Sequence, residues 1–317
     1  MNVPLFPTVS SLISQIDAAS LESYSTEEEW IEARKNGIGA SESAILFGQG
    51  YAGSSPYKMY CEKLGLIPRD DMEQKSLRIG KLMEPVLRRL CTEETGLPCY
   101  EVGENHTFRS TKYSFLTASL DGLIIDEGGI GVLELKNIHY FNREEWSDGS
   151  GPLKYQIQLQ HQLAVTNLQY GYLFGLVGGQ EPYAHKIQRN DSFIEKALIP
   201  ACESFFQAMQ SRNPPDIDGS EATAKAIKLL HPDDDGSEIL LDERFSDFDL
   251  RLEEIKAQQK SLDSERKIIE NEFKSAIGSS TFGLLSSGTR YSLKTTQKDG
   301  YWVNSQKYRT LLRKKAT

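Results

Sequence analysis

The stretch that decides the fold reads Leu120-Asp121-Gly122-Leu123-Ile124-Ile125-Asp126-Glu127-Gly128-Gly129-Ile130-Gly131-Val132-Leu133-Glu134-Leu135-Lys136. Two apolar runs flank an Asp-Glu-Gly-Gly turn signal, and this pattern predicts a β-hairpin into which the segment 115–119 leads. Because residues two apart share one face of a strand, Glu134 and Lys136 should point the same way, while Leu133 and Leu135 face the core. Asp121, on the partner strand, can then approach Glu134 across the pair.

Two carboxylates and a lysine around one point suit a hard divalent cation and an activated water, the arrangement that phosphodiester hydrolysis needs. A Glu-x-Lys pair on a strand is, taken alone, typical of a solvated charge pair. The functional interpretation therefore depends on the residues that accompany it along the chain.

Length and composition indicate a soluble globular protein of 317 residues with one large domain and an appendage, or with two domains. No apolar run approaches the roughly 18 residues of a spanning helix, and no signal segment precedes the first helix, so we expect a cytoplasmic protein without a membrane partner.

Four cysteines without CxxC spacing predict reduced thiols and no zinc site. The net charge is −9, but residues 286–317 carry +7, which indicates a basic tail that steers DNA or is merely solvated.

The order of elements predicts an α/β domain over residues 1–213, a linker over 214–238 and a helical arm over 239–317. The domain should contain the hairpin, a strand at 170–177, and helices at 26–37, 56–64, 76–95, 154–167 and 191–211. The linker is rich in Pro, Asp, Gly and Ser. In the arm, apolar residues recur every three or four positions over 241–276, which predicts a long amphipathic helix of coiled-coil type. A small β segment and a basic helix should finish the chain.

A second group of residues suits a phosphate. Trp30 and Arg34 share one face of a predicted helix, and Ser41 can cap the next helix, so an arginine fork, a hydroxyl and free backbone amides come together. The alternative is a core tryptophan, a surface arginine and an ordinary cap. Four glutamines at alternate positions of the 154–167 helix are either a polar surface or groups that orient a water or a phosphate. They are Gln156, Gln158, Gln160 and Gln162.

Taken in order, these residues resemble the YqaJ-type viral recombinase family, to which the lambda-type alkaline exonucleases belong. The resemblance covers about residues 28–180. It rests on Trp30-x3-Arg34-x2-Gly37-Ile38-Gly39-Ala40-Ser41-Glu42, Gly80-Lys81-Leu82-Met83-Glu84-Pro85, Ser119-Leu120-Asp121-Gly122, Leu133-Glu134-Leu135-Lys136 and Tyr155-Gln156-Ile157-Gln158-Leu159-Gln160-His161-Gln162-Leu163-Ala164-Val165-Thr166. It implies the PD-(D/E)xK nuclease fold, a central mixed sheet flanked by helices. Ser119-Leu120-Asp121 replaces the Pro-Asp of that name, a departure that removes no ligand.

The resemblance also implies an activity: 5′-to-3′ exonucleolytic digestion of linear double-stranded DNA in a bacterial cell, by an enzyme that a phage or mobile element encodes. The digestion exposes a 3′ single strand for a single-strand annealing protein, and lambda-type members form homo-oligomeric rings, for which a trimer is one candidate. By the same analogy Glu84, Asp121 and Glu134, with the Leu135 carbonyl, would hold Mg²⁺, as two ions that Mn²⁺ can replace. Lys136 would position the attacking water.

The analogy assigns the remaining residues as well. Arg34 and Ser41, with Trp30 and Gln162, would receive the 5′-phosphate, and Gln158 or Gln160 would support the catalytic site. Two other functions stay open at this stage. One is a RecB-like or structure-specific endonuclease of the same fold, and the other is a non-catalytic module that binds DNA ends and recruits a partner.

Overall fold

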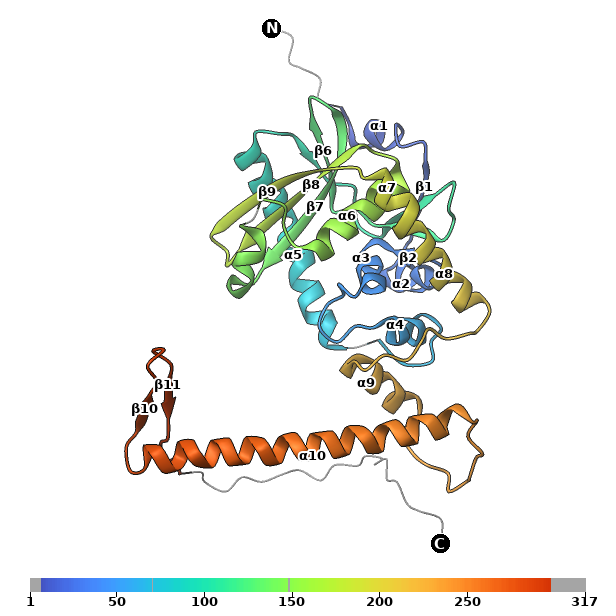
Figure 1. Ribbon diagram of the computed structural model, residues 1–317. Helices are drawn as coiled ribbons and strands as arrows, with labels where there is room; N and C mark the ends of the chain where they lie inside the picture. Colours follow the sequence, from blue (N-terminus) through green and yellow to red (C-terminus); the bar gives the residue numbers. More distant parts are fainter. Residues whose placement is uncertain (1–6, 70, 148, 298–317) are drawn as a thin grey trace. The chain divides into compact units, whose positions relative to one another are not determined.

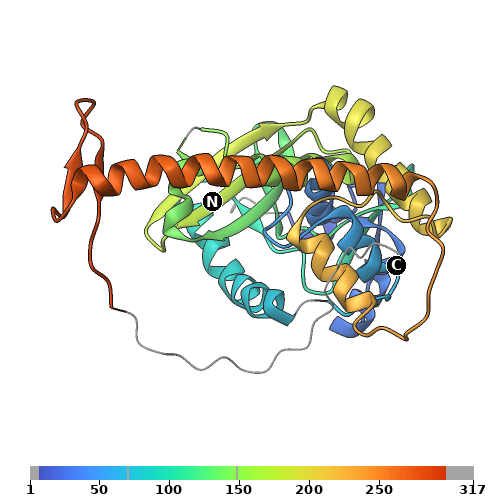
Figure 2. The same ribbon diagram turned by 60° about the horizontal axis from the view of Figure 1, so that its bottom comes forward.

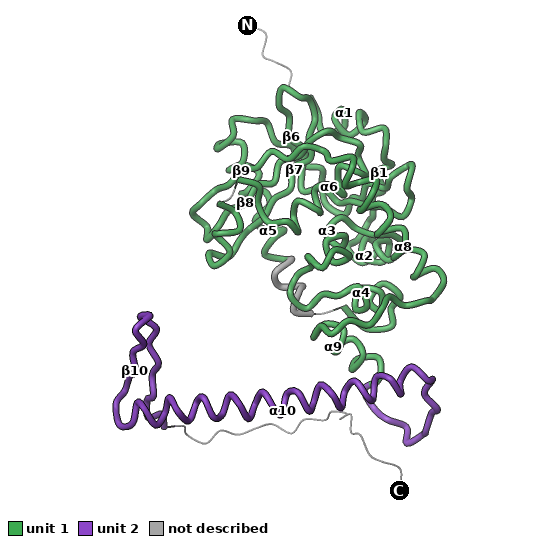
Figure 3. The backbone as a smooth tube through the Cα atoms, in the orientation of Figure 1, with its two compact units in different colours: residues 1–231 green, residues 232–317 purple. Residues whose placement is uncertain are grey.

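A computed structural model describes residues 7–69, 71–147 and 149–297, and of residues 71–77 it describes the backbone alone. The chain divides into two compact units, residues 1–231 and residues 232–317 (Figure 3). All of the predicted site residues lie in the first unit.

The larger sheet of the first unit has five strands in the order β3-β6-β7-β8-β9 (Figure 1). They are β3 Cys99–Tyr100, β6 Gly122–Asp126, β7 Gly129–Ile138, β8 Tyr170–Val177 and β9 Glu181–Gln188. Strands β6 and β7 form the predicted hairpin, and β7 runs parallel to β8 through the connecting helix α6, Leu153–Thr166. The sheet is therefore mixed and flanked by helices, which confirms the predicted α/β class.

Strand β7 is buried on both faces. Leu133 and Leu135 pack in one cluster with Leu87 of helix α5, Asp71–Thr95, as the alternation predicts. Val132 packs in a second cluster with Leu159 of α6. The crossover helix between parallel strands lies over the second face, so the charged residues of β7 lie beneath a helix and not in open solvent.

A second sheet has the order β1-β4-β5-β2 and carries the N-terminal helices. Its strands are β1 Ala19–Ser23, β4 His106–Ser110, β5 Leu116–Ala118 and β2 Ile38–Gly39. The segment 115–119 thus does not extend the hairpin, because β5 pairs with β4 and β2. Short helices connect these strands: α1 Val9–Ile13, α2 Glu27–Ala33, η1 Arg34–Asn36, α3 Ala40–Ser43, η2 Ala44–Phe47 and α4 Pro56–Lys63. Thr26 caps α2, since its Oγ1 accepts the Glu29 N–H at 3.2 Å.

The remaining helices of the first unit are η3 Tyr140–Trp146, α7 Asp191–Phe193, η4 Ile194–Leu198, α8 Ile199–Gln210 and α9 Glu221–Leu230. The last of them corrects the prediction of a linker over residues 214–238. Ser220 caps α9, and Thr223 and Ala226 are buried, with Thr223 Oγ1 donating to Ser55 Oγ at 2.9 Å. An amphipathic helix that packs on its own domain therefore occupies the middle of the segment, whose composition is linker-like only at its two ends.

The second unit is built on the helix α10, Arg244–Ile277, which confirms the predicted long helix and runs unbroken in both views (Figure 1 and Figure 2). A hairpin of β10, Phe282–Leu284, and β11, Arg290–Ser292, follows it, and Tyr291 stacks on Phe273 with ring centroids 4.2 Å apart. The basic helix predicted at the end of the chain lies outside the described residues. In the described part, none of the helices combines the length and apolarity that crossing a membrane requires. All four cysteines are free thiols.

Candidate active site

The hairpin brings Asp121 next to Glu134. Asp121 directly precedes β6, whose first residue pairs with Leu133, so the two acidic residues lie opposite each other. The Asp121 Oδ2 atom accepts the Leu135 N–H at 2.8 Å. The Asp121 carbonyl accepts a hydrogen bond from Arg88 Nη2 at 3.0 Å, so both strand β7 and helix α5 fix this residue.

Glu134 is held by three side chains. It is 1% exposed, and both of its oxygens accept hydrogen bonds at 2.5 Å, Oε1 from Gln158 Nε2 and Oε2 from Gln162 Nε2. Its Oε1 also forms an ion pair with Lys136 Nζ. Gln158 and Gln162 are four residues apart and share one face of α6, so this helix fixes the Glu134 carboxylate on the sheet face that it covers.

We call Asp121, Glu134 and Glu84 the carboxylate centre, in which the pKa values of Asp121 and Glu84 are raised. Burial raises the pKa of Asp121 well above its usual value, and the charges of Glu134 and Glu84 raise it further. Burial likewise raises the pKa of Glu84. The charge of Arg88 opposes this rise, and the charge of Glu134 adds to it. Burial alone would lower the pKa of Lys136, but the charges of Glu134, Tyr51 and Asp121 raise it, so Lys136 stays protonated.

The donor atoms of this centre fit a hard cation. In the described part of the chain, no three acidic, histidine or cysteine side chains already converge on one point as a metal-binding group. Glu84, Asp121 and Glu134 nevertheless offer the oxygen ligands that Mg²⁺ takes.

The second group of predicted residues also comes together in the structure. The Arg34 guanidinium lies over the Trp30 ring, 4.8 Å from its centroid, and Arg34 Nη2 donates to Ser41 Oγ at 3.4 Å. Trp30 Nε1 points into the same region, since it donates to Thr107 Oγ1 at 3.1 Å and to Ser119 Oγ at 3.4 Å. We call Trp30, Arg34 and Ser41 the receptor cluster.

A buried lysine that the sequence did not single out holds this cluster together. Lys63 Nζ donates to Glu42 Oε2 at 2.8 Å, to the Gly37 carbonyl at 2.7 Å and to the Arg34 carbonyl at 2.9 Å. The Gly39 N–H donates to the same Glu42 oxygen at 2.7 Å. The ammonium group thus uses all three of its donors on the backbone and carboxylate around Arg34.

The receptor cluster has an excess of positive charge. Burial lowers the pKa of Arg34, and the charge of Glu42 opposes this change. The charge of Arg69 lowers the pKa further, so Arg69 is a third cation near Arg34 and Lys63. Among the side chains that the structure describes, Arg34, Lys63 and Arg69 thus face one carboxylate, Glu42. Such a surplus on a partly buried arginine attracts an anion with several acceptor oxygens, as a phosphate has.

Ser119 links the two clusters. Its hydroxyl accepts from Trp30, and its carbonyl accepts a 3.4 Å hydrogen bond from Gln162, whose same amide nitrogen holds Glu134. Gln162 therefore lies between the receptor cluster and the carboxylate centre. Ser119 stands directly before the Leu120-Asp121 motif, but nothing in its own residue type predicted this linking position.

Two predictions about individual residues are wrong. Ser41 does not cap the next helix, because α3 begins one residue earlier at Ala40, and Glu42 accepts the free Gly39 N–H. Gln160 does not face Glu134: its Nε2 donates to the Gln188 carbonyl at 2.8 Å. Two residues along a helix turn the side chain to the far side, so Gln158 and Gln162 reach the centre and Gln160 cannot.

Comparison with known proteins gives matches that span both clusters. Residues 29–169 match the family model of the YqaJ-like viral recombinase domain. Over 267 residues the chain is 26% identical to the protein named Uncharacterized protein YqaJ of Bacillus subtilis (strain 168), a match that covers 82% of this chain and 81% of that protein.

Two solved structures are similar in part. The alkaline exonuclease LHK-Exo from Laribacter hongkongensis is 21% identical, with a TM-score of 0.46 over 59% of this chain and 94% of that chain. A phage related exonuclease from Haemophilus somnus 129PT is 14% identical, with a TM-score of 0.30 over 64% of this chain and 94% of that one.

Proposed function

We propose that this protein is a nuclease acting on DNA, and specifically a metal-dependent 5′-to-3′ exonuclease on linear double-stranded DNA, since residues 29–169 match the family model of the YqaJ-like viral recombinase domain. One observation supports it above the others: a buried carboxylate centre adjoins a cationic receptor cluster, and Gln162 and Ser119 link the two. A nuclease that starts at a DNA end needs both a cleavage centre and a place for the terminal phosphate.

The carboxylate centre would hold Mg²⁺, or Mn²⁺ in its place, through Asp121, Glu134 and Glu84, with the Leu135 carbonyl as a further ligand. Two such ions would activate water and neutralise charge on the scissile phosphate. Gln158 and Gln162 orient the Glu134 carboxylate, and the Arg88 bond holds the backbone of Asp121.

Lys136 is suited to orienting the attacking water or the phosphate rather than to removing a proton. Its raised pKa keeps it charged at neutral pH, so it has no free lone pair to act as a base. The charge it provides lies next to Glu134, where negative charge would build up during hydrolysis.

Arg34 and Ser41 would receive the 5′-phosphate, over the Trp30 ring, and Lys63 would keep Arg34 in place through its backbone carbonyl. The same proposal includes three finer points: action in the cytoplasm, assembly into a homo-oligomeric ring, and delivery of the 3′ overhang to a single-strand annealing protein. An exposed apolar stripe of Ile79, Leu82 and Val86 on α5 supports the expectation of a protein contact.

Digestion of matched DNAs tests the proposal. Linear duplexes with 5′-phosphate or 5′-hydroxyl ends and a covalently closed circle are incubated with Mg²⁺ or with EDTA. We expect Mg²⁺-dependent loss of 5′ nucleotides from the linear DNAs alone, faster with the phosphate, and no cleavage by Asp121→Ala, which should still bind DNA. Cutting of the circle would instead indicate an endonuclease, and intact DNA under every condition would indicate an end-binding module.

A further inference from the structure

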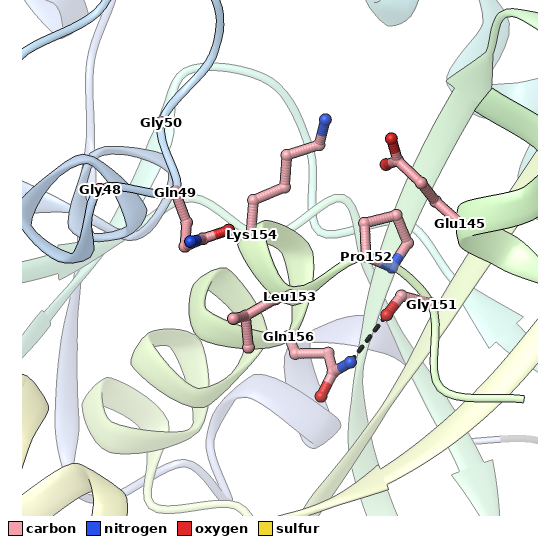
Figure 4. A pocket seen from close by; sticks show the side chains of 9 residues that line it. All are labelled: Gly48, Gln49, Gly50, Glu145, Gly151, Pro152, Leu153, Lys154 and Gln156. Atoms are coloured by element: carbon pink, nitrogen blue, oxygen red, sulfur yellow. Dashed lines mark hydrogen bonds between the residues drawn. The ribbon is translucent and has the colours of Figure 1, made fainter. Parts of the chain in front are cut away.

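A cavity of about 470 Å³ lies beside the N-terminal end of α6, apart from the receptor cluster (Figure 4). Backbone of Gly48 and Gly50, from the loop after η2, forms one wall, and Gln156 of α6 forms another. Figure 4 shows the charged ends of Lys154 and Glu145 on the same side of the cavity. The volume is within the range of small-molecule sites, and the lining combines apolar groups and glycine backbone with polar and charged side chains.

Two tyrosine rings and two lysines connect this cavity to the carboxylate centre. The Lys154 ammonium lies 5.1 Å from the centroid of the Tyr155 ring and 5.5 Å from that of Tyr51, and Lys136 Nζ lies 5.1 Å from the Tyr155 centroid. The two rings are 6.3 Å apart. Tyr155 is buried, whereas Tyr51, which directly follows the cavity-lining Gly50, is 44% exposed, so part of its side chain is accessible to a ligand.

Lys154 has its charge available. In the described part of the chain its ammonium contacts only the two tyrosine rings and makes no ion pair. Glu145 lines the same cavity and can accept from the amino groups of a nucleobase. A cation, an open ring and polar side chains are the elements with which proteins bind single-stranded nucleic acid.

Helix α6 sets the spacing between these groups. Gln158 and Gln162 both hold Glu134, Gln162 also reaches Ser119 beside the receptor cluster, and Lys154, four residues before Gln158 on the same side of the helix, borders the cavity. The interval from Gln158 to Lys154 advances ~6 Å along the helix axis. That step is of the size of one nucleotide along an extended strand, so the cavity lies one position beyond the carboxylate centre.

We propose that the cavity beside Tyr51 and Lys154 binds the second nucleotide of the digested strand, on the 3′ side of the scissile phosphate. Its base stacks on the Tyr51 ring, and Lys154 binds the phosphate that follows. This inference rests on the proposed function, because the order of subsites along α6 takes the receptor cluster as the place of the 5′-phosphate. It adds a subsite that retains DNA after each nucleotide leaves.

A binding experiment without catalysis tests the subsite. In EDTA, the affinity of the full chain is measured for a 5′-phosphorylated mononucleotide and for the matching dinucleotide that carries a 3′-phosphate. We expect the second nucleotide to improve the Kd of the wild type, and Tyr51→Ala to weaken the dinucleotide about tenfold, the loss of one stacked base. Tyr51→Phe keeps the ring and should bind as the wild type does.

Lys154→Ala provides the independent variant, and Lys112→Ala is its matched control, since Lys112 also lies over a tyrosine ring, 4.9 Å from the Tyr113 centroid, on the turn after β4. Lys154→Ala should weaken the dinucleotide severalfold and leave the mononucleotide unchanged, and Lys112→Ala should change neither. Equal dinucleotide affinities of Tyr51→Ala, Lys154→Ala and the wild type would overturn the inference, and so would a wild type that gains nothing from the second nucleotide.

Single-turnover cleavage with Mg²⁺ separates this inference from the proposed function. The release of the first nucleotide is timed on duplexes whose second position is a normal or an abasic nucleotide. We expect the abasic site to slow the wild type and to have no further effect on Tyr51→Ala. A wild type that cleaves both duplexes equally refutes the subsite alone, whereas a wild type that cleaves neither refutes the proposed function.

Discussion

Acidification tests how tightly α6 packs behind the receptor cluster, because the buried His161 lies there. Its ring is fully buried near the backbone of Ile38 and Thr117, and neither nitrogen has a hydrogen-bond partner of normal geometry among the described residues. Burial lowers the pKa of His161 from its ordinary 6.5 to about 4, although nearby Glu42 acts in the opposite direction. The native protein therefore holds this histidine neutral.

The difference between the pKa of His161 in the unfolded and in the folded chain sets the sign and size of the change in stability with pH. The unfolded chain takes up the proton near pH 6.5 and the folded chain only near pH 4, so His161 costs nothing above pH 6.5 and destabilises the fold as the pH falls from 6.5 toward 4. With these two values, the free energy of unfolding decreases by about 2 kcal/mol at pH 5.

Urea unfolding at pH 7 and pH 5, followed by the fluorescence of the buried Trp146, measures this loss in the wild type and in His161→Leu. We expect the variant to lose about 2 kcal/mol less than the wild type between the two pH values. Leu163→Ala, two residues along the same helix, is the control: its cavity should lower stability by about 3 kcal/mol at both pH values and keep the wild-type slope. A His161→Leu variant with the wild-type slope would refute the reasoning.

Four further predictions concern the two clusters and the arm. Lys136→Ala should slow cleavage at least ~100-fold while DNA binding and far-UV circular dichroism stay unchanged, and wild-type turnover would contradict its role. Lys63→Met should lower the free energy of unfolding by about 3 kcal/mol because the half-buried Glu42 and the carbonyls of Arg34 and Gly37 lose the ammonium group that they share, as urea titration can check. Arg34→Ala should erase the preference for 5′-phosphorylated over 5′-hydroxyl ends, and an unchanged rate ratio would reject that assignment. Deletion of residues 239–317 should leave single-turnover cleavage of short duplexes intact, since the first unit holds the site residues, and its loss would place the arm in the reaction.

The features that the sequence predicted are those set by local rules. The hairpin β6–β7 follows from two apolar runs and a glycine turn, and strand pairing alone then places Asp121 opposite Glu134. Likewise, the recurrence of apolar residues every three or four positions marks α10. In each case the information lies within about thirty residues of sequence and needs no knowledge of the tertiary fold.

The features that it missed depend on contacts between distant segments. Lys63 has no pattern of its own on α4, and only the fold brings it to the carbonyls of Arg34 and Gly37, which lie 29 and 26 residues away in sequence. The two sheets divide residues 115–136 between them because β5 finds partners in β4 and β2. The glutamines were ambiguous for the opposite reason: three of them satisfy parts of one motif. The four-residue spacing pairs Gln158 with Gln162 and Gln156 with Gln160, and only the packing of α6 on the sheet shows that the first pair reaches Glu134.

The first unit carries a group of positive charges and a group of negative charges at two places beside helix α6. Among the side chains that the structure describes near the receptor cluster, Arg34, Lys63 and Arg69 outnumber Glu42, whereas around the middle of α6 the acids Asp121 and Glu134 outnumber Lys136. Under the proposed function, a DNA end would be attracted to the first position by the charge already present, and a bound cation would neutralise the second position for the phosphate that follows. Attachment of the end and cleavage of the strand would then be separate events, and a net charge of −9 would be compatible with a DNA substrate, because the surplus of positive charge would lie where the strand begins.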